Sequence, residues 1–183
     1  MVFLRCKVLV LGDASVGKTA LIQSFISNGS SFPKNYVMTQ CAAITQKVVD
    51  IPETDSNVEL NIFDIAGQSI YKDQVPNMMG QASAVVLVYD ITNDESFNSM
   101  EYWLRIVKEK CRDAPIIGVV VAAKIDQSDL AVIGSEEGED WAASQGFGYF
   151  NTSANRGQGL DDPFTHIANT FYEQYEDQVA KLR

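Results

Sequence analysis

The stretch GDASVGKT, residues 12–19, decides the fold of this 183-residue chain. Gly12 and Gly17 allow the backbone to curl and to turn its N–H groups inward around a phosphate. Lys18 can then reach the β- and γ-phosphates of a nucleotide, and the hydroxyl of Thr19 is placed to ligate Mg²⁺. The apolar run CKVLVLG precedes the stretch, and TALIQSFI follows it at helical spacing. A strand, this loop and a helix in that order are typical of a phosphate-binding loop.

The composition is that of an ordinary globular chain, and it excludes several classes of function. With 46% hydrophobic residues, a chain of this length is expected to form one domain with a sizeable core. The net charge of −10 disfavours bulk attraction to nucleic acid or to anionic lipid. No apolar run is long enough for a membrane span, and the N-terminus leads directly into a predicted strand instead of a signal peptide.

The cysteines favour a reducing, cytoplasmic environment. Cys6, Cys41 and Cys111 are an odd, scattered set without the spacing of a metal site. None lies close to the final residues AKLR, so a prenyl anchor and direct attachment to lipid are not expected.

Short apolar runs separated by helical stretches predict an α/β fold. The predicted strands are residues 6–12, 44–51, 57–64, 83–90, 115–123 and 147–154, and the predicted helices are residues 19–26, 94–110, 136–145 and 164–179. The first, fourth and fifth strands are nearly continuous in Val, Leu and Ile, as in a parallel sheet covered on both faces. The second and third alternate more and are joined by PETDS, which predicts an antiparallel hairpin at one edge. We therefore predict three layers: a six-stranded, mostly parallel sheet with one antiparallel edge strand and helices on both faces.

Four polar segments follow predicted strands and should meet at one edge of this sheet. They are GDASVGKT, DIAGQ (64–68), AAKIDQ (122–127) and NTSAN (151–155). Ligands of open α/β sheets bind at the carboxyl ends of the strands. Four segments suited to a nucleotide at that edge therefore predict a nucleotide site more strongly than any one of them alone.

The segment DIAGQ predicts a magnesium ligand and residues for hydrolysis. Asp64 can hold Mg²⁺ through a water molecule, opposite Thr19. Gly67 leaves its backbone N–H free to approach a γ-phosphate. Gln68 has both a donor and an acceptor, so it can orient an attacking water molecule.

The segment AAKIDQ predicts recognition of guanine. The carboxylate of Asp126 can accept two hydrogen bonds from the N1–H and N2–H₂ edge of guanine, which adenine lacks. Lys124 can lay its aliphatic stem along the plane of the base.

Together these motifs resemble the Ras superfamily of small GTPases, and the resemblance covers essentially the whole chain. The spacing and the segment YDITNDESF (89–97) are most similar to the Rab branch. Within that branch, LRCKVLVLG, FPKNYVMT, VELNIFDIAG and the ending DDPFTHIANTFYEQYEDQVAKL resemble the Rab-like GTPases of intraflagellar transport. The resemblance implies a single P-loop small GTPase domain over residues 1–183 that slowly hydrolyses GTP to GDP. It also implies a place in the cilium or flagellum and a stable heterodimer with intraflagellar transport subunit 25, a small β-sandwich protein, within the B complex.

The resemblance assigns roles residue by residue. It implies nucleotide binding by Asp13, Ala14, Ser15, Val16, Gly17, Lys18, Thr19, Ala20, Lys124, Asp126, Ser153 and Ala154. It implies Mg²⁺ ligation by Thr19, Thr39 and Asp64, and catalytic roles for Gln68, Lys18 and Gly67. The two switch segments, which change order between the GTP and GDP states, correspond roughly to residues 30–43 and 66–80.

The chain also departs from the family pattern. Ala123 stands where the guanine motif normally begins with Asn, and loss of that amide should cost roughly 1–3 kcal/mol in nucleotide binding. Ala14 stands where the family often has Gly, close to the γ-phosphate, and its methyl group can obstruct an arginine finger. The segments QCAA after Thr39 and Ser-Ile-Tyr at residues 69–71 also differ from typical Rabs, so we expect different regulators and effectors.

The sequence is also compatible with two other functions. The first is a structural subunit that keeps the GTPase fold but switches little, which Ala123 favours. The second is another P-loop enzyme, an ATPase or a small-molecule kinase, although such an enzyme would not need Lys124 and Asp126. Candidate partner surfaces are the last helix and the Met78–Met79 pair, and ordinary core packing is the alternative for both.

Overall fold

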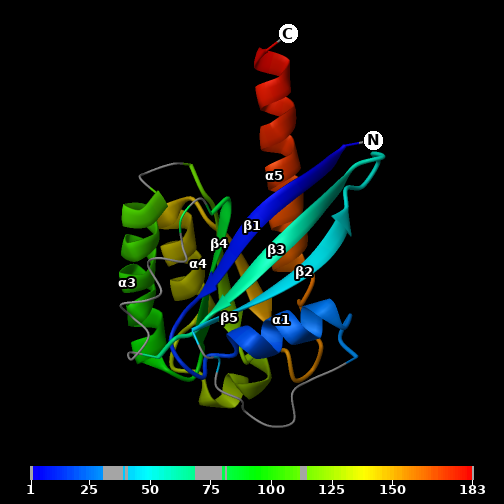
Figure 1. Ribbon diagram of the computed structural model, residues 1–183. Helices are drawn as coiled ribbons and strands as arrows, with labels where there is room; N and C mark the ends of the chain where they lie inside the picture. The colour runs from blue at the N-terminus through cyan, green and yellow to red at the C-terminus, as the bar shows by residue number, and fades with distance from the viewer. Residues whose placement is uncertain are drawn as a thin grey trace.

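The described residues form a six-stranded sheet through the centre of the molecule (Figure 1). The computed structural model describes residues 2–30, 39, 41–68, 80, 82–111 and 115–182. The strands are β1 Phe3–Leu11, β2 Ala42–Asp50, β3 Asn57–Ile65, β4 Ala84–Asp90, β5 Ile117–Ala123 and β6 Gly148–Thr152. Their order across the sheet is β2-β3-β1-β4-β5-β6.

The pairing of the strands confirms the predicted topology. β1 runs parallel to both β3 and β4, β4 runs parallel to β5, and β5 runs parallel to β6. β2 pairs antiparallel with β3 and lies at the edge, as the alternating pattern predicted. Every residue of β4 and β5 is buried, because both faces of these central strands are covered.

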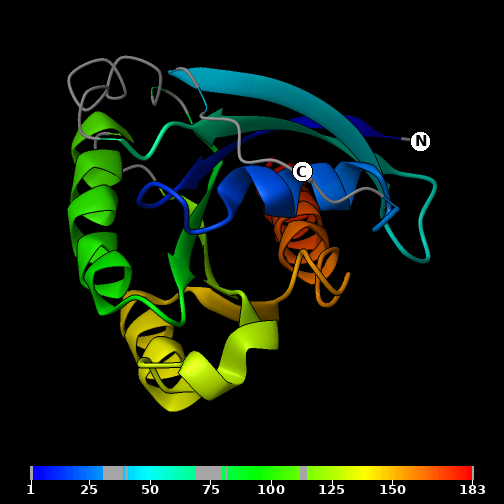
Figure 2. The ribbon, with the colours of Figure 1, turned by 90° about the horizontal axis from the view of Figure 1, so that it is seen from below.

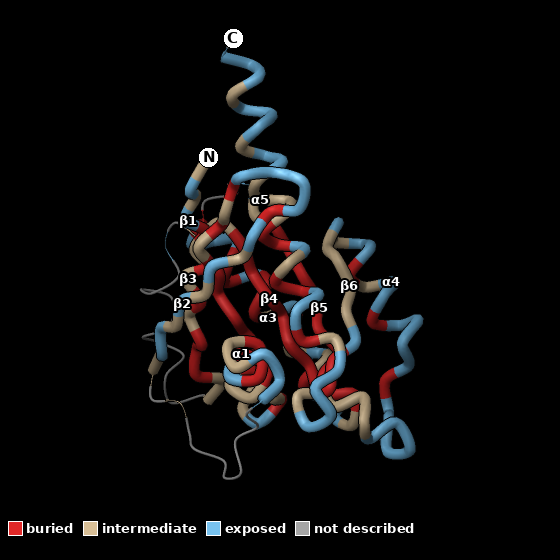
Figure 3. Tube along the Cα trace, turned by 90° about the vertical axis from the view of Figure 1, so that its right-hand side faces the viewer, coloured by how far each residue is buried: buried red, intermediate tan, exposed pale blue. Residues whose placement is uncertain are grey.

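Helices cover both faces of the sheet, which confirms the three layers (Figure 2). The helices are α1 Lys18–Ile26, α3 Asp94–Cys111, α4 Ser135–Gln145 and α5 Asp162–Lys181. One core cluster joins the sheet to α1 and α5, where the rings of Phe25 and Phe164 stack with centroids 4.1 Å apart. The other joins the sheet to α3 and α4 through residues such as Trp103 and Ala142. The buried residues lie along the sheet and the inner faces of the helices, whereas the last turns of α5 are exposed (Figure 3).

One short element was not predicted. Residues Ile125–Leu130 form a 3₁₀ helix, η2, directly after β5. It contains no buried residue, so it gives no apolar periodicity from which it could be predicted. No described helix is long and apolar enough to cross a membrane.

Candidate nucleotide-binding site

The phosphate loop joins the end of β1 to the start of α1, as the sequence predicted. Gly12 has a φ of 145°, and a Cβ atom there would lie 2.2 Å from the carbonyl oxygen of Val88, so only glycine fits. Ser15 and Gly17 also have positive φ values, of 65° and 110°. This run of unusual backbone conformations curls the loop around the first turn of α1, the geometry in which backbone N–H groups can gather around an anion.

Lys18 lies inside the curl of the loop. Its ammonium group donates hydrogen bonds to the carbonyl oxygens of Gly12 at 2.9 Å and Asp13 at 2.7 Å. Burial lowers the pKa of Lys18 to about 8, and the negative charges of Asp64 and Asp13 partly oppose this shift. The loop therefore holds a buried cation that an anionic ligand would stabilise.

Three predicted metal ligands converge beside this lysine. The hydroxyl of Thr19 donates a 2.6 Å hydrogen bond to Asp64 Oδ2. Thr39 Oγ1 lies 3.0 Å from Thr19 Oγ1 and donates to the same carboxylate oxygen at 3.3 Å. Three segments distant in the sequence thus bring two hydroxyl groups and one carboxylate together.

The chemistry of this cluster fits Mg²⁺. Its donors are all oxygen atoms, which this hard cation prefers. Asp64 is 3% exposed, and its Oδ1 atom has no hydrogen-bond partner among the described residues. Burial raises the pKa of the Asp64 carboxyl, against the opposing effects of Thr19, Lys18 and Thr39. A buried carboxylate oxygen without a partner is costly unless a ligand or cation satisfies it.

The segment after β3 lies directly on the phosphate loop. A Cβ atom on Gly67 would come within 2.3–2.5 Å of the backbone of Gly12, Asp13 and Ala14. The chain continues from there into Gln68, which is half-buried. The rest of the second predicted switch up to residue 79, with Met78 and Met79, lies outside the described residues, as does FPKNYVM of the first switch.

The predicted guanine motifs line a pocket of about 290 Å³ next to the loop. Its lining residues are Gly17, Ala20, Leu21, Ala123, Lys124, Asp126, Gln127, Thr152, Ala154 and Asn155. The pocket thus lies between the start of α1 and the turns that follow β5 and β6. These are the strand ends at which the sequence predicted a nucleotide base.

The side chain of Asp126 is held by the turn after β6. Ser153 Oγ donates to Asp126 Oδ1 at 2.6 Å, and Asn155 Nδ2 donates to Oδ2 at 3.1 Å. Slight burial raises the pKa of Asp126, but these hydrogen bonds outweigh it and leave the pKa below its ordinary value. Asp126 therefore stays an acceptor-only carboxylate near neutral pH, as a partner for guanine N–H donors requires.

Sequence reasoning missed two supporting side chains, those of Asp90 and Trp103. Lys124 Nζ forms a 2.5 Å ion pair with Asp90 at the end of β4, and Trp103 Nε1 of α3 donates a 2.9 Å hydrogen bond to Asp13 Oδ1. Asp90 is the last residue of the predicted strand 83–90, so its place at the same sheet edge could have been predicted. Trp103 and Asp13 are 90 positions apart in the sequence, so no local pattern could predict the contact between them.

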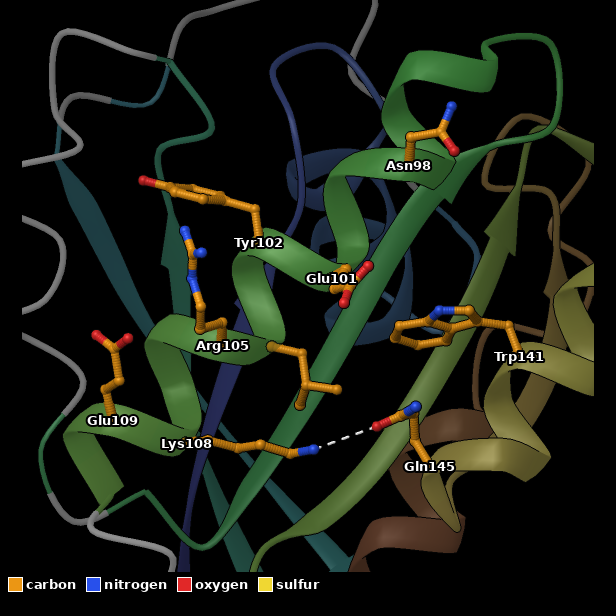
Figure 4. Close-up of a pocket in the computed structure, with 9 residues that line it drawn as sticks. Asn98, Glu101, Tyr102, Arg105, Lys108, Glu109, Trp141 and Gln145 are labelled. Atoms are coloured by element: carbon orange, nitrogen blue, oxygen red, sulfur yellow. Dashed lines mark hydrogen bonds between the residues drawn. The ribbon is translucent and has the colours of Figure 1, made fainter.

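A larger groove of about 640 Å³ lies between α3 and α4, and it is lined by none of the predicted site residues. Figure 4 shows Trp141 and Gln145 of α4 facing Glu101 and Lys108 of α3 across it. Lys108 donates a 3.2 Å hydrogen bond to Gln145 Oε1. The volume of a cavity alone therefore does not identify the pocket that the predicted site residues line.

The sheet order, with a phosphate loop between β1 and α1, defines a P-loop small GTPase fold. The family model described as Ras family matches residues 7–173, and the chain belongs to this family. Intraflagellar transport protein 27 of Chlamydomonas reinhardtii is 40% identical over 184 residues, 98% of this chain and 90% of the relative. The Homo sapiens homolog of that protein is 36% identical over 183 residues, 100% and 98% of the two chains. DnaJ homolog subfamily C member 27 of Danio rerio is 33% identical over 178 residues, but these are only 64% of its length.

Proposed function

We propose that this chain is a Rab-like small GTPase that binds GTP and GDP with Mg²⁺, slowly hydrolyses GTP, and acts as a switch or regulatory subunit in intraflagellar transport. The observation that carries the proposal is the convergence at one sheet edge of a buried lysine, an oxygen cluster and a pocket lined by Asp126. Residues 1–183 act as one small GTPase domain in this proposal.

The phosphate loop binds the phosphates of the nucleotide. The backbone N–H groups of Asp13, Ala14, Ser15, Val16, Gly17, Lys18, Thr19 and Ala20 surround them, with the positive end of α1 directed at the same charge. Lys18 exchanges its carbonyl partners for phosphate oxygens and stabilises the charge that develops during hydrolysis.

Thr19, Thr39 and Asp64 hold the Mg²⁺ ion. When bound, Mg²⁺ neutralises charge on the β- and γ-phosphates. Thr39 belongs to the first switch, so its position beside Thr19 and Asp64 links the order of that segment to the state of the nucleotide.

Hydrolysis uses the segment after β3. Gly67 lies against the loop backbone. In this proposal its backbone N–H contacts the γ-phosphate, and Gln68 orients the attacking water. No arginine occurs in residues 12–43, so neither the loop nor the first switch supplies an arginine finger. We expect intrinsic turnover no faster than that of Ras, on the order of 10⁻⁴ s⁻¹.

Base recognition uses the pocket beside the loop. Asp126 accepts hydrogen bonds from the N1–H and N2–H₂ groups of guanine, and the stem of Lys124 covers the base. Backbone groups of Ser153 and Ala154 contact the guanine oxygen. Ala123 supplies no amide to this arrangement, so we expect weaker binding than in a typical Rab.

The transport role rests on similarity to proteins named intraflagellar transport protein 27. We propose that the chain works in the cytoplasm and in the cilium or flagellum. We further propose that it pairs with intraflagellar transport subunit 25 and joins the B complex. The exposed last turns of α5, with Tyr175 and Val179 half-buried, offer a surface for that partner.

The test is a fluorescence titration of the purified protein with labelled GTP, GDP and ATP, with and without Mg²⁺. Guanine-selective, Mg²⁺-dependent binding supports the proposal, and hydrolysis assays follow. No binding at micromolar guanine nucleotide overturns it and favours the structural-subunit alternative, for which Ala123 is the specific observation. Preference for ATP would instead identify another P-loop enzyme.

A further inference from the structure

Trp103 connects the hydrophobic core to the phosphate loop. The indole is 1% exposed within the core cluster on the α3 face, and its Nε1–H group donates to Asp13 Oδ1 at 2.9 Å. In Figure 2 the loop after β1, in blue, comes close to the green helix α3. The Asp13 carboxylate is therefore fastened to a rigid helix.

The position of this carboxylate matters because Asp13 is an anion beside a predicted anion site. Lys18 Nζ already donates to the backbone oxygen of Asp13, and the charge of the Asp13 carboxylate reaches that ammonium. A carboxylate free to rotate could pair with Lys18 and would repel a phosphate in the same loop. Loss of the indole N–H would remove the hydrogen bond that holds it toward α3.

We propose that Trp103 is a positioning residue for nucleotide binding. Its indole N–H holds the Asp13 carboxylate toward α3 and leaves Lys18 available to the phosphates. This inference rests on the proposed nucleotide-binding function. It gives α3, which contains none of the sequence motifs, a role in phosphate binding.

The test measures GDP affinity in a set of variants at both ends of the hydrogen bond. Trp103→Phe keeps a buried aromatic ring but removes the donor, and we expect GDP to bind about tenfold more weakly. Asp13→Glu keeps the negative charge but places the carboxylate one methylene farther from the backbone, so it disturbs the contact without touching the core. It tests the contact even if Trp103→Phe fails to fold, and it should weaken GDP binding by a similar factor. Asp13→Asn keeps an oxygen acceptor for the indole and removes the negative charge, so it should weaken GDP binding less than Trp103→Phe does.

The decisive variant is Trp103→Phe combined with Asp13→Asn. Because the substitution neutralises the freed carboxylate, we expect this double variant to recover most of the affinity that Trp103→Phe loses. A merely structural role for the indole would leave the loss unchanged, since Asn at position 13 cannot repair core packing. Trp141→Phe, at the α3–α4 groove, is the matched control and should leave GDP affinity unchanged.

The outcomes separate the two proposals. If the wild-type protein binds GDP but Trp103→Phe has no effect, or Asp13→Asn does not restore the loss, the positioning role is wrong and the proposed function stands. If the wild-type protein binds no guanine nucleotide, the proposed function fails and this inference fails with it.

Discussion

The hydroxyl of Thr19 donates a 2.6 Å hydrogen bond to Asp64 Oδ2 and so joins the first turn of α1 to the end of β3. The two residues are 45 positions apart in the sequence. The other carboxylate oxygen, Asp64 Oδ1, is buried with no hydrogen-bond partner in the described part of the chain. The contact therefore leaves a partly satisfied anion in the protein interior, which a divalent cation would stabilise.

We expect Asp64→Asn to remove the Mg²⁺ dependence of GTP binding without unfolding the protein. The amide oxygen can still accept from Thr19, while the charge that attracts a cation is lost. Titration of labelled GTP with Mg²⁺ and with a chelator should show at least a tenfold difference for the wild type and little difference for the variant.

Asp55→Asn is the matched control, because Asp55 is exposed in the turn between β2 and β3. It should keep the wild-type Mg²⁺ dependence. Full Mg²⁺ dependence in Asp64→Asn would show that this carboxylate does not hold the ion.

The buried ammonium of Lys18 gives a second prediction, in the pH dependence of stability. Its pKa falls from 10.5 in the unfolded chain to about 8 in the folded one. Between these values the unfolded chain keeps a proton that the folded chain releases, so Lys18 makes the nucleotide-free protein more stable as pH rises. The contribution is at most of the order of 3 kcal/mol. A bound phosphate stabilises the charged lysine, so saturating GDP should reduce this rise.

Urea unfolding across this pH range, with and without GDP, measures the effect. Cys6 acts in the opposite direction above about pH 9, because burial raises its pKa to about 12. The difference between the wild type and Lys18→Met isolates the lysine. If the free energy of unfolding depends on pH in the same way in both proteins, the proton released on folding comes from a group other than Lys18.

Much of the fold follows from local patterns in the sequence. The nearly continuous apolar runs at β4 and β5 predicted buried parallel strands, and both strands are buried throughout. The alternating β2 and β3 predicted an antiparallel edge pair, which the structure confirms. The polar 3₁₀ helix η2 was missed because it buries nothing and so leaves no periodic signal.

In the candidate site, too, the residues that belong to sequence motifs could be predicted, whereas a contact that depends on helix packing could not. Lys18, Asp64 and Asp126 belong to motifs with fixed spacing, and strand order brings them to one sheet edge. The contact between Trp103 and Asp13 depends on how α3 packs on the sheet, so it required the structure.

We expect Gly67→Ala to impair hydrolysis and leave the fold intact. A Cβ atom at this position would collide with the loop backbone at Asp13, so the segment after β3 must move away from the phosphates. Single-turnover measurements should show hydrolysis slowed at least tenfold. Gly134→Ala is the control, since a Cβ there meets nothing within 4 Å, and it should hydrolyse GTP normally. Wild-type turnover in Gly67→Ala would contradict the role assigned to this contact.

Ala123 ends β5, is 5% exposed and lines the pocket, with its Cβ 3.9 Å from where a Cβ on Gly17 would lie. An amide at this position can therefore reach toward both the phosphate loop and a bound base. We expect Ala123→Asn to tighten GDP and GTP binding roughly 5- to 150-fold, mainly through slower dissociation.

Ala123→Leu controls for side-chain shape in this prediction, because Leu has the same branching and number of heavy atoms as Asn but cannot form hydrogen bonds. Displacement of labelled GDP by excess unlabelled nucleotide gives the dissociation rate for each variant. Slower release from Ala123→Asn but not from Ala123→Leu would identify the missing amide as the cause of weak binding. An unchanged dissociation constant in Ala123→Asn would mean that this position does not limit affinity, and the reason for any weak binding would then have to lie in the switches or in the partner.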